Sequence, residues 1–383
     1  MTMSIACPFK AMKTAKSVGI GISNDGKSDG SVKYREVSDL LRKEILAGKY
    51  SPGSAFPSLK MICCRFGVSY LTAVRATESL KELGLVRSKN GVGTFVKRQM
   101  MTVGLVMPML KQVEVYPPIC QEFSRLCLEK GVSIDFADIS ALRSDRVRPV
   151  VVAAARRMVS DGVAGVVFHP VDFGDRADRT NREVLRIFRS AKIPVVILDA
   201  DMESESARDR FDFVGVDNFE IGKIVGRHVI ERGAKKIAFA AWADMSANVR
   251  RRLDGLMAAI AQKRGVTFAG SGLYLQESAA LAAKWRRSPP DAVVCSSDLV
   301  AANVLKLLRR IGKRCPRDIL VTGVDDVNLA TLVSPTITTV RQPCAEIAAT
   351  VLETLFWRFD NPEKDKRRIM LAADLVVRES TMR

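Results

Sequence analysis

The stretch IPVVILD, which runs from Ile193 to Asp199, decides how the larger part of this chain folds. Residues 195–198 are an uninterrupted run of Val, Ile and Leu, which is typical of a strand buried on both faces of a parallel sheet. Asp199 follows directly, at the carboxyl end of the strand, where such sheets bind their ligands. The stretch therefore predicts a central parallel strand with a candidate binding residue after it.

Similar apolar runs lie on both sides of this strand, separated by segments with helical spacing. Before it, we expect strands at residues 102–107, 132–136 and 163–168 and helices at residues 118–130, 151–160 and 182–190. After it, we expect strands at residues 213–216, 236–241, 292–295 and 319–324 and helices at residues 219–232, 249–263 and 299–311. Two successive alternations of this kind predict an α/β core of two doubly wound parallel lobes over residues 102–383.

The part of the chain before residue 98 has a different pattern. Apolar residues between Val37 and Leu46 recur at helical spacing, and Ser58 and Ser69 are each placed to cap a further helix. Short strands at residues 85–87 and 94–96 flank a basic, glycine-bearing hairpin tip. This order predicts a winged helix-turn-helix DNA-binding domain at residues 33–97. We expect residues 1–32 to form a flexible basic tail and residues 98–101 to form a linker.

The net charge of +18 is concentrated in this N-terminal part. Residues 1–101 contain 17 Lys and Arg against 7 Asp and Glu, whereas the rest of the chain contains 43 against 35. A basic N-terminal module indicates a nucleic-acid partner. Hydrophobic residues make up 47% of the chain, which excludes a largely disordered protein, and no run approaches the ~18 apolar residues that a membrane span needs.

The third helix of the predicted winged domain has two distinct faces. At 100° per residue, the residues expected to pack inward are Ala73, Ala76, Leu80 and Leu83. The residues expected to face outward are Tyr70, Leu71, Val74, Arg75 and Glu78. The outward face is the one that would enter the major groove of DNA.

These segments resemble the GntR-type DNA-binding domain. The matching residues, in the family's order and spacing, are Pro52-Gly53, Phe56-Pro57-Ser58, Gly67-Val68-Ser69, Thr72, Leu80, Gly84-Leu85 and GVGTFV at residues 91–96. The resemblance implies DNA contacts from Lys60, Ser69, Tyr70, Thr72, Gly91 and Gly93, and we add Lys89 at the basic wing tip. An arginine common in the family aligns with Val74, and Arg75 stands one position further around the helix.

Two interpretations of this departure remain open. In one, Leu71 and Val74 contact thymine methyl groups while Arg75 contacts guanine or a phosphate. In the other, these residues pack on another protomer, or DNA binding is weak. We take Arg75 as a DNA contact.

The core resembles the LacI/GalR-type regulatory domain, which is similar to periplasmic sugar-binding proteins, over essentially all of residues 102–383. The matching stretches are residues 193–199 (IPVVILD), 214–218 (VGVDN), 230–238 (IERGAKKIA), 252–255 (RLDG), 295–298 (CSSD), 323–326 (GVDD), 334–340 (SPTITTV) and 375–381 (LVVREST). A GntR-type head on such a core resembles regulators of the arabinose-repressor type.

This second resemblance implies an effector site at the strand ends. The family's effector contacts align with Asp199, Arg252, Asp298 and Asp325, whose charged groups suit the hydroxyls of a sugar. Phe168 and His169 end a strand of the first lobe, so we expect one of them to stack on the ligand, and we choose Phe168.

Each of these site residues also has a purely structural interpretation. Asp298 could cap the helix that begins at Leu299, and Asp325 could hold a turn. Arg252 could pair with Asp254 on the surface. Ser297 stands where the family often has an asparagine, which puts the identity of the ligand in doubt.

The two resemblances together imply a transcription regulator. We expect a repressor that binds double-stranded operator DNA as a homodimer and responds to a small-molecule effector, a sugar or a sugar derivative. The alternative is a solute-binding protein of sugar uptake, against which stand the winged helix and the lack of a secretion signal at residues 1–32.

We expect no enzymatic activity, because no nucleophile–base pairing or carboxylate pair stands out beyond the predicted effector site. The eight cysteines lack metal-site spacing and the two histidines are too few and too scattered for a metal cluster, so no metal or other cofactor is expected. The apolar surroundings of several cysteines suit reduced thiols, and we expect the protein to be cytoplasmic and not bound to a membrane.

Overall fold

The computed structural model describes residues 30–46, 49–51, 53–89, 91–96, 101–107, 115–138, 144–171, 177–200, 211–242, 245–270 and 278–382. The chain divides into two compact units, Met1–Gln99 and Met100–Arg383. Residues 1–29 of the tail predicted at residues 1–32, and residues 98–100 of the linker predicted at residues 98–101, lie outside the described residues. Residues 30–32 are not tail but the first residues of a helix. The domain boundaries drawn from the sequence stay predictions.

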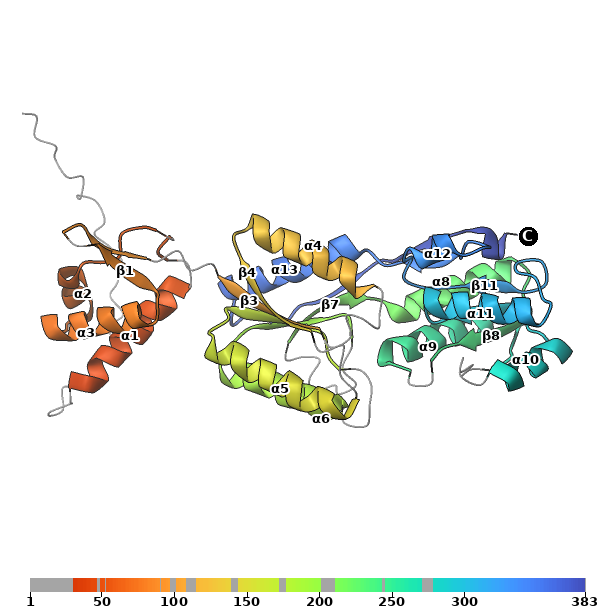
Figure 1. Cartoon of the computed structure of the whole chain (residues 1–383), viewed down its shortest axis with the longest axis horizontal. Coiled ribbons are helices and arrows are strands. Elements are labelled where there is room, and N and C mark those ends of the chain that lie inside the picture. The colour runs from red at the N-terminus through yellow and green to blue at the C-terminus, as the bar shows by residue number, and fades with distance from the viewer. Residues whose placement is uncertain are drawn as a thin grey trace, which may run out of the picture. The chain divides into compact units, whose positions relative to one another are not determined.

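The first unit is a three-helix domain with a β-hairpin (Figure 1). Its elements are α1 (Gly30–Leu46), α2 (Leu59–Phe66), α3 (Tyr70–Glu82), β1 (Val86–Lys89) and β2 (Gly93–Val96). The two strands pair antiparallel, with Lys89 opposite Gly93. Leu41, Ile62 and Leu80 are almost completely buried between the helices, so each helix contributes to one small core.

The predicted inward face of α3 is only partly correct. Ala73, Ala76 and Leu80 are fully buried, whereas Leu83 is 48% exposed. The helix ends at Glu82, so Leu83 no longer follows the helical rotation that the prediction assumed. Thr77 takes a buried position instead, and its Oγ1 donates a hydrogen bond to the carbonyl oxygen of Ala73 at 2.8 Å.

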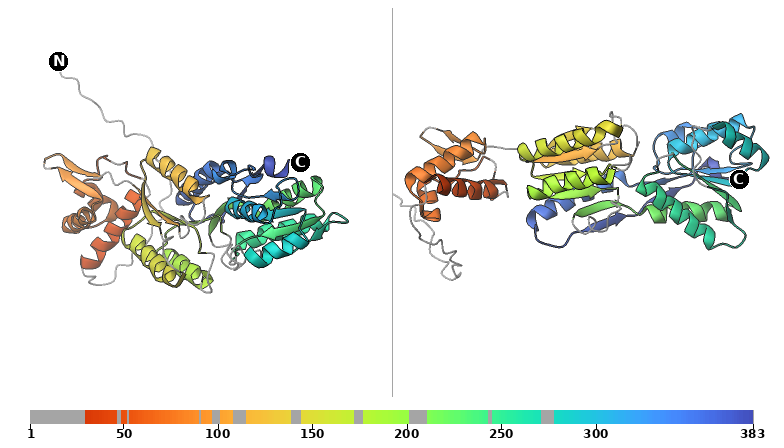
Figure 2. Two further views of the ribbon diagram at one scale, coloured as in Figure 1. Left: turned by 45° about the vertical axis from the view of Figure 1, so that its right-hand side comes forward. Right: turned by 90° about the horizontal axis from the view of Figure 1, so that it is seen from below.

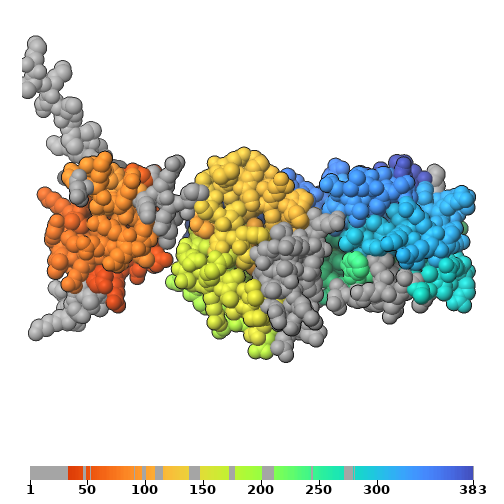
Figure 3. All heavy atoms as spheres, viewed as in Figure 1, coloured from red at the N-terminus to blue at the C-terminus, as the bar shows by residue number. Residues whose placement is uncertain are grey.

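The first lobe of the second unit is a six-stranded parallel sheet in the order β13-β7-β6-β5-β3-β4. The strands are β3 (Thr102–Met107), β4 (Ser133–Asp138), β5 (Gly165–Phe168), β6 (Val195–Leu198), β7 (Asp212–Val216) and β13 (Arg368–Leu371). The covering helices are α4 (Tyr116–Glu129) and α13 (Cys344–Asp360) on one face, and α5 (Ser144–Ser160) and α6 (Ala177–Ser190) on the other (Figures 1 and 2). In the space-filling view, side chains of α4 and α5 form much of the visible surface of this lobe (Figure 3).

The second lobe is a parallel sheet in the order β11-β10-β8-β9. The strands are β8 (Lys236–Ala240), β9 (Thr267–Phe268), β10 (Ala292–Cys295) and β11 (Leu320–Thr322). The helices are α8 (Asn218–Glu231) and α9 (Ala247–Ala261) on one face, and α10 (Ser278–Arg287), α11 (Asp298–Arg310) and α12 (Leu329–Leu332) on the other. The prediction of two doubly wound parallel α/β lobes is confirmed.

The chain passes between the lobes at residues 216–218, 341–344 and 371–374. Two of these crossings run antiparallel as β12 (Thr339–Arg341) and β14 (Asp374–Val376), after which the short 3₁₀ helix η2 (Glu379–Thr381) lies against the second lobe. Parallel sheets place their binding residues at the carboxyl ends of the strands. In this unit, those ends of both sheets point toward the crossings.

Candidate DNA-binding surface and effector site

The N-terminus of α3 is fixed by a side-chain cap. Ser69 Oγ accepts a hydrogen bond from the backbone N–H of Thr72 at 3.2 Å, and it lies 2.8 Å from Thr72 Oγ1. Ser58 caps α2 in the same manner, with its Oγ 3.3 Å from the Met61 nitrogen. Both predicted caps are confirmed, and they set the turn between the two helices together with Gly67, whose φ is +61°.

The outer surface of α2 and α3 combines apolar and basic side chains. Met61, Tyr70 and Leu71 are each more than 60% exposed, and Lys60 and Arg75 are also exposed. Large apolar side chains at this exposure are unusual on a domain surface and indicate a contact surface. The predicted DNA-contact residues of these helices therefore lie where a partner can reach them, although Thr72 is half-buried.

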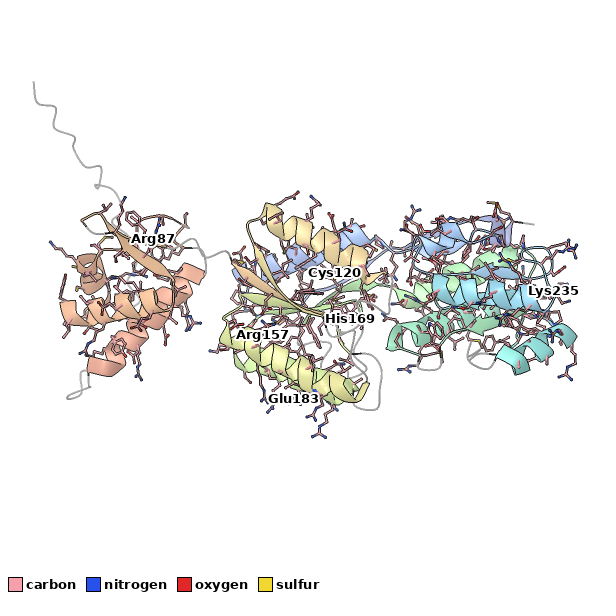
Figure 4. The ribbon with its side chains drawn as sticks, in the orientation of Figure 1. Arg87, Cys120, Arg157, His169, Glu183 and Lys235 are labelled. Atoms are coloured by element: carbon pink, nitrogen blue, oxygen red, sulfur yellow. The ribbon has the colours of Figure 1, made fainter. Side chains whose placement is uncertain are left out.

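The wing is a short basic hairpin. Arg87 and Lys89 are exposed on β1 (Arg87 is labelled in Figure 4). Gly91 and Gly93 have φ values of +72° and +136°, which residues with a Cβ rarely adopt. The backbone conformation accounts for both glycines, and their predicted role in DNA contact stays a prediction.

Arg65 at the end of α2 is occupied within the domain. Its guanidinium forms an ion pair with Glu44 of α1 and donates to the Tyr50 hydroxyl at 3.0 Å. Hydrogen bonds from Arg65, Lys49 and Tyr50 lower the pKa of Glu44 to about 2. This cluster holds α1 against α2.

A second polar site lies in the other unit, where the two lobes meet. Asp199 follows β6, is 4% exposed and has a φ of +60°. Its Oδ2 accepts a hydrogen bond from the Tyr116 hydroxyl at 3.1 Å, and the same hydroxyl lies 2.6 Å from His169 Nε2. His169 is fully buried after β5 and lies at the end of the first-lobe sheet nearest the second lobe (Figure 4).

The second lobe reaches this cluster through α9. Asn248 Nδ2 donates to Asp199 Oδ2 at 3.1 Å, so one hydrogen bond joins the two lobes directly. Arg252 lies one turn further along and is 7% exposed. Its Nε donates to Asn218 Oδ1 at 2.7 Å, and its Nη1 donates to the carbonyl oxygen of Ser296 at 2.6 Å.

Asp325 faces the same arginine from the end of β11. Its Oδ1 lies 3.8 Å from Arg252 Nη2 and accepts a hydrogen bond from Gln342 Nε2 at 2.7 Å. Its φ is +110°, a strained conformation for a residue with a Cβ. Strained residues such as Asp199 and Asp325 persist where the surrounding structure fixes them, and they are frequent at ligand sites.

Asp298 has a different environment from the other three predicted charged residues. It is completely buried at the start of α11, where Oδ1 accepts from Thr339 Oγ1 at 2.6 Å and Oδ2 from the Val327 nitrogen at 3.0 Å. Burial raises the pKa of this carboxyl to about 7, and the neighbouring Asp325 adds to the effect. The side chain ties α11 to the crossing strand β12 in this structure.

These contacts decide against the structural alternatives for Asp298 and Arg252, whereas the turn considered for Asp325 stays an open alternative. The helix cap at α11 is Ser297, not Asp298, because Ser297 Oγ accepts from the Val300 nitrogen at 3.4 Å. Arg252 is buried toward Asp325 rather than paired on the surface with Asp254, which is exposed.

Phe168 was assigned to the ligand incorrectly. Its side chain is fully buried in the apolar core between the sheet and helices α5 and α6. Successive residues of a strand point to opposite faces, so the neighbouring His169 reaches the polar cluster instead. His169 could be found from the sequence, whereas Tyr116, Asn248 and Gln342 were missed. They lie on a helix face or at a crossing between the lobes, and neither a strand end nor a matched family stretch marks them.

The described residues contain neither a metal-ligand cluster nor a candidate membrane-spanning helix. No group of three or more His, Cys, Asp or Glu side chains there is arranged to hold a metal ion. Among the same residues, no helix is both long and apolar enough to cross a membrane.

Two regions of the chain match known families. Residues 33–96 match the family described as bacterial regulatory proteins of the gntR family, and residues 227–381 match the periplasmic binding protein-like domain. The chain therefore contains a gntR-type helix-turn-helix region followed by a periplasmic binding protein-like region.

Two individual relatives are transcriptional repressors by name. The arabinose metabolism transcriptional repressor of Geobacillus stearothermophilus is 25% identical over 371 residues, covering 91% of this chain and 97% of that protein. The transcriptional repressor PurR of Photobacterium profundum is 31% identical over 200 residues, which are 50% of this chain and 58% of PurR. The chain thus spans little more than half the length of the PurR relative.

Solved structures show the same fold. The complex of the transcriptional regulator CelR with cellobiose aligns with a TM-score of 0.61 at 24% identity, covering 85% of this chain and all of that chain. A periplasmic binding protein/LacI transcriptional regulator from Alkaliphilus metalliredigens QYMF, solved with D-xylulofuranose, aligns with a TM-score of 0.60 at 19% identity, covering 74% and 100%.

Proposed function

We propose that this protein is a transcriptional repressor whose binding to operator DNA is controlled by a sugar. The observation that carries the proposal is the buried polar cluster that joins the two lobes through Asp199, Asn248, Arg252 and Asp325. Its likeness over nearly the whole length to an arabinose metabolism repressor supports the same function, and so do the cellobiose and D-xylulofuranose bound by its structural relatives.

The cluster suits a ligand that couples the lobes. A sugar bonded to Asp199 of the first lobe and to Arg252 of the second would stabilise one arrangement of the lobes over another. A ligand shifts such an equilibrium only by the difference between its affinities for the two arrangements. The direct Asn248–Asp199 hydrogen bond is the contact that a bound sugar would replace or extend.

The N-terminal unit would bind the operator. In this proposal the contacts to DNA come from Lys60, Ser69, Tyr70, Thr72, Arg75, Lys89, Gly91 and Gly93. A homodimer would place two such units on a pseudo-palindromic operator, with residues 98–101 as the linker to each effector domain. The protein would act in the cytoplasm, where its operator lies, and it would need neither a cofactor nor a catalytic residue.

The proposal is tested by asking whether the full chain selects DNA. Purified protein is incubated with sheared genomic DNA from its own source, and the retained fragments are sequenced and inspected for a shared inverted repeat. We expect enrichment of a few promoter fragments. If the protein retains no DNA above a chain lacking residues 1–99, the proposal is wrong, and sugar binding without DNA binding would favour the solute-binding alternative.

A further inference from the structure

Three buried polar atoms around the effector cluster have no hydrogen-bond partner among the described residues. They are Asp199 Oδ1, His169 Nδ1 and Gln342 Oε1. Their side chains belong to residues that are 4%, 0% and 3% exposed. A buried polar atom without a hydrogen-bond partner destabilises the folded protein, so three of them around one cluster indicate a ligand that completes them.

All three atoms are hydrogen-bond acceptors. Asp199 Oδ1 belongs to a carboxylate and Gln342 Oε1 to an amide carbonyl, and neither oxygen can donate. For His169 the tautomer follows from the Tyr116 hydroxyl, which has one hydrogen and lies between a carboxylate oxygen and His169 Nε2. That hydrogen goes to Asp199, which only accepts, so Nε2 carries a proton toward the tyrosine oxygen, and in the neutral imidazole Nδ1 is then the acceptor.

The charges around the cluster also disfavour a negatively charged ligand. Burial raises the pKa of the Cys344 thiol to about 11, and the carboxylates of Asp325 and Asp199 raise it further, so the negative charge of both reaches the start of α13. Arg252 is the cation facing them among the described residues of the cluster, and its guanidinium is already bonded to Asn218 and Ser296. An incoming anion would meet two carboxylates and an arginine that already donates two hydrogen bonds and faces Asp325.

We propose that this site selects a sugar that donates hydrogen bonds and carries no negative charge, that is, a neutral or amino sugar rather than a sugar phosphate or sugar acid. This inference rests on the proposed function, because it assumes that the cluster binds a sugar. Hydroxyl and ammonium groups would satisfy the three acceptors, whereas phosphate and carboxylate oxygens would face them with further acceptors.

The test uses matched sets of ligands on the full chain. Each set contains a neutral sugar with its phosphate, its acid and its amino derivative, starting from glucose, galactose, arabinose and ribose as far as each derivative exists. Thermal shift identifies the sets that bind, and calorimetry gives the Kd of every member. We expect the neutral or amino member to bind at least about tenfold more tightly than the phosphate or the acid.

The outcomes separate the two proposals. If a phosphate or an acid binds most tightly in its set, the selectivity is wrong while the sugar-responsive function stands. If no member of any set raises the melting temperature, the sugar-responsive function fails, and the selectivity fails with it.

A pair of matched variants tests whether Asp199 causes this selectivity. Asp199→Asn removes the carboxylate with little change of shape. We expect it to raise the Kd of the neutral sugar about tenfold and to reduce the difference in affinity between the neutral sugar and its phosphate. Asp254→Asn removes the same charge from the exposed side of α9 and serves as the control. Equal selectivity in the wild type and Asp199→Asn would overturn the assignment of Asp199.

The tautomer of His169 can be measured without any ligand. The chain has two histidines, so ¹⁵N-histidine labelling gives two imidazole signal sets, and His169→Gln identifies which set belongs to His169. We expect the imidazole to carry its proton on Nε2 and to leave Nδ1 bare. A protonated Nδ1 would overturn the account of the three acceptors.

Discussion

Arg75 is the basic side chain that α3 offers in its exposed middle part, because the position before it is Val74. The caps at Ser58 and Ser69 hold the two helices in the arrangement that presents this face. Arg65 is engaged with Glu44, so it does not compete for this role. At the scale of single residues, the proposed function therefore predicts that sequence specificity in this unit depends on Arg75 together with apolar neighbours.

Replacing Arg75 with Ala should weaken binding to an enriched operator fragment by about 10–100-fold, since a bidentate contact to a base is worth about 1–3 kcal/mol. Electrophoretic mobility shift over a range of salt concentrations measures the effect. A phosphate contact would lower the salt slope by about 1, whereas a base contact would relax the sequence preference. Lys306→Ala, which removes an exposed positive charge from α11, is the control. An unchanged affinity for Arg75→Ala would exclude Arg75 from the interface.

Asp298 gives a prediction about pH. Its folded-state pKa of about 7 lies above the ordinary value of 3.8, so folding favours the protonated form. The resulting stabilisation is complete below the ordinary value and is lost as the pH rises through about 7, at roughly 1.4 kcal/mol per unit of pKa difference. Asp298→Asn should therefore become more stable relative to the wild type between about pH 5 and about pH 8.

Urea unfolding of both proteins at the two pH values measures this difference. Glu44, whose pKa is about 2, stays ionised over the whole window and does not contribute. If the two unfolding free energies change in parallel with pH, Asp298 is not protonated in the folded protein.

The sequence located part of the buried polar cluster, the candidate effector site, at this scale. Asp199, Arg252 and Asp325 could be found because a carboxylate after a strand, or a matched family stretch, marks them in the chain. Tyr116 and Asn248 could not, because each lies on a helix face that meets the cluster only after the lobes are assembled. Phe168 and His169 are neighbours in sequence, and the choice between them depended on which face of the sheet each one meets.

At the scale of elements, helices α8 and α9 of the second unit pack with their backbones in close contact. A Cβ added to Gly255 would lie 1.9 Å from the carbonyl oxygen of Phe219, and one added to Gly222 would lie 1.9 Å from the carbonyl oxygen of Arg252. Both neighbours are backbone atoms, so neither can move aside alone. The two glycines therefore set the separation of the helices and, with it, the position of Arg252.

Gly255→Ala should push α9 away from α8 and destabilise the second unit by roughly 1–3 kcal/mol, as expected for overpacking. Urea unfolding measures this loss, and sugar affinity should fall in parallel because Arg252 lies on the displaced helix. Met257→Ala changes a side chain that is 39% exposed on the same helix, so its effect should stay within about 0.5 kcal/mol. A Gly255→Ala protein as stable as the wild type would contradict the packing argument.

The order of elements was largely predictable, since buried strands and amphipathic helices alternate visibly. The helix expected at residues 299–311 is α11 at Asp298–Arg310, for example. Helix α13 and strand β13 were not predicted. They follow the second-lobe elements in sequence and yet return to the first sheet, and the pattern within a segment does not show which sheet it joins.

At the scale of the whole molecule, a unit with a gntR-type helix-turn-helix region is followed by a unit whose two lobes are linked at a buried polar cluster. The family matches cover residues 33–96 of the first unit and residues 227–381 of the second, and the excess of positive charge is densest in the N-terminal part. Control of the first unit by the second is the central claim of the proposed function. It requires a coupling free energy between the sugar and the DNA.

That coupling is measured directly by fluorescence anisotropy of a labelled operator fragment titrated with the full chain at fixed salt, without sugar and with the sugar that most raises the melting temperature at saturation. The account predicts that the Kd for the operator changes by about tenfold or more, within the usual range of allosteric coupling. Equal Kd values with and without a sugar that demonstrably binds would contradict it.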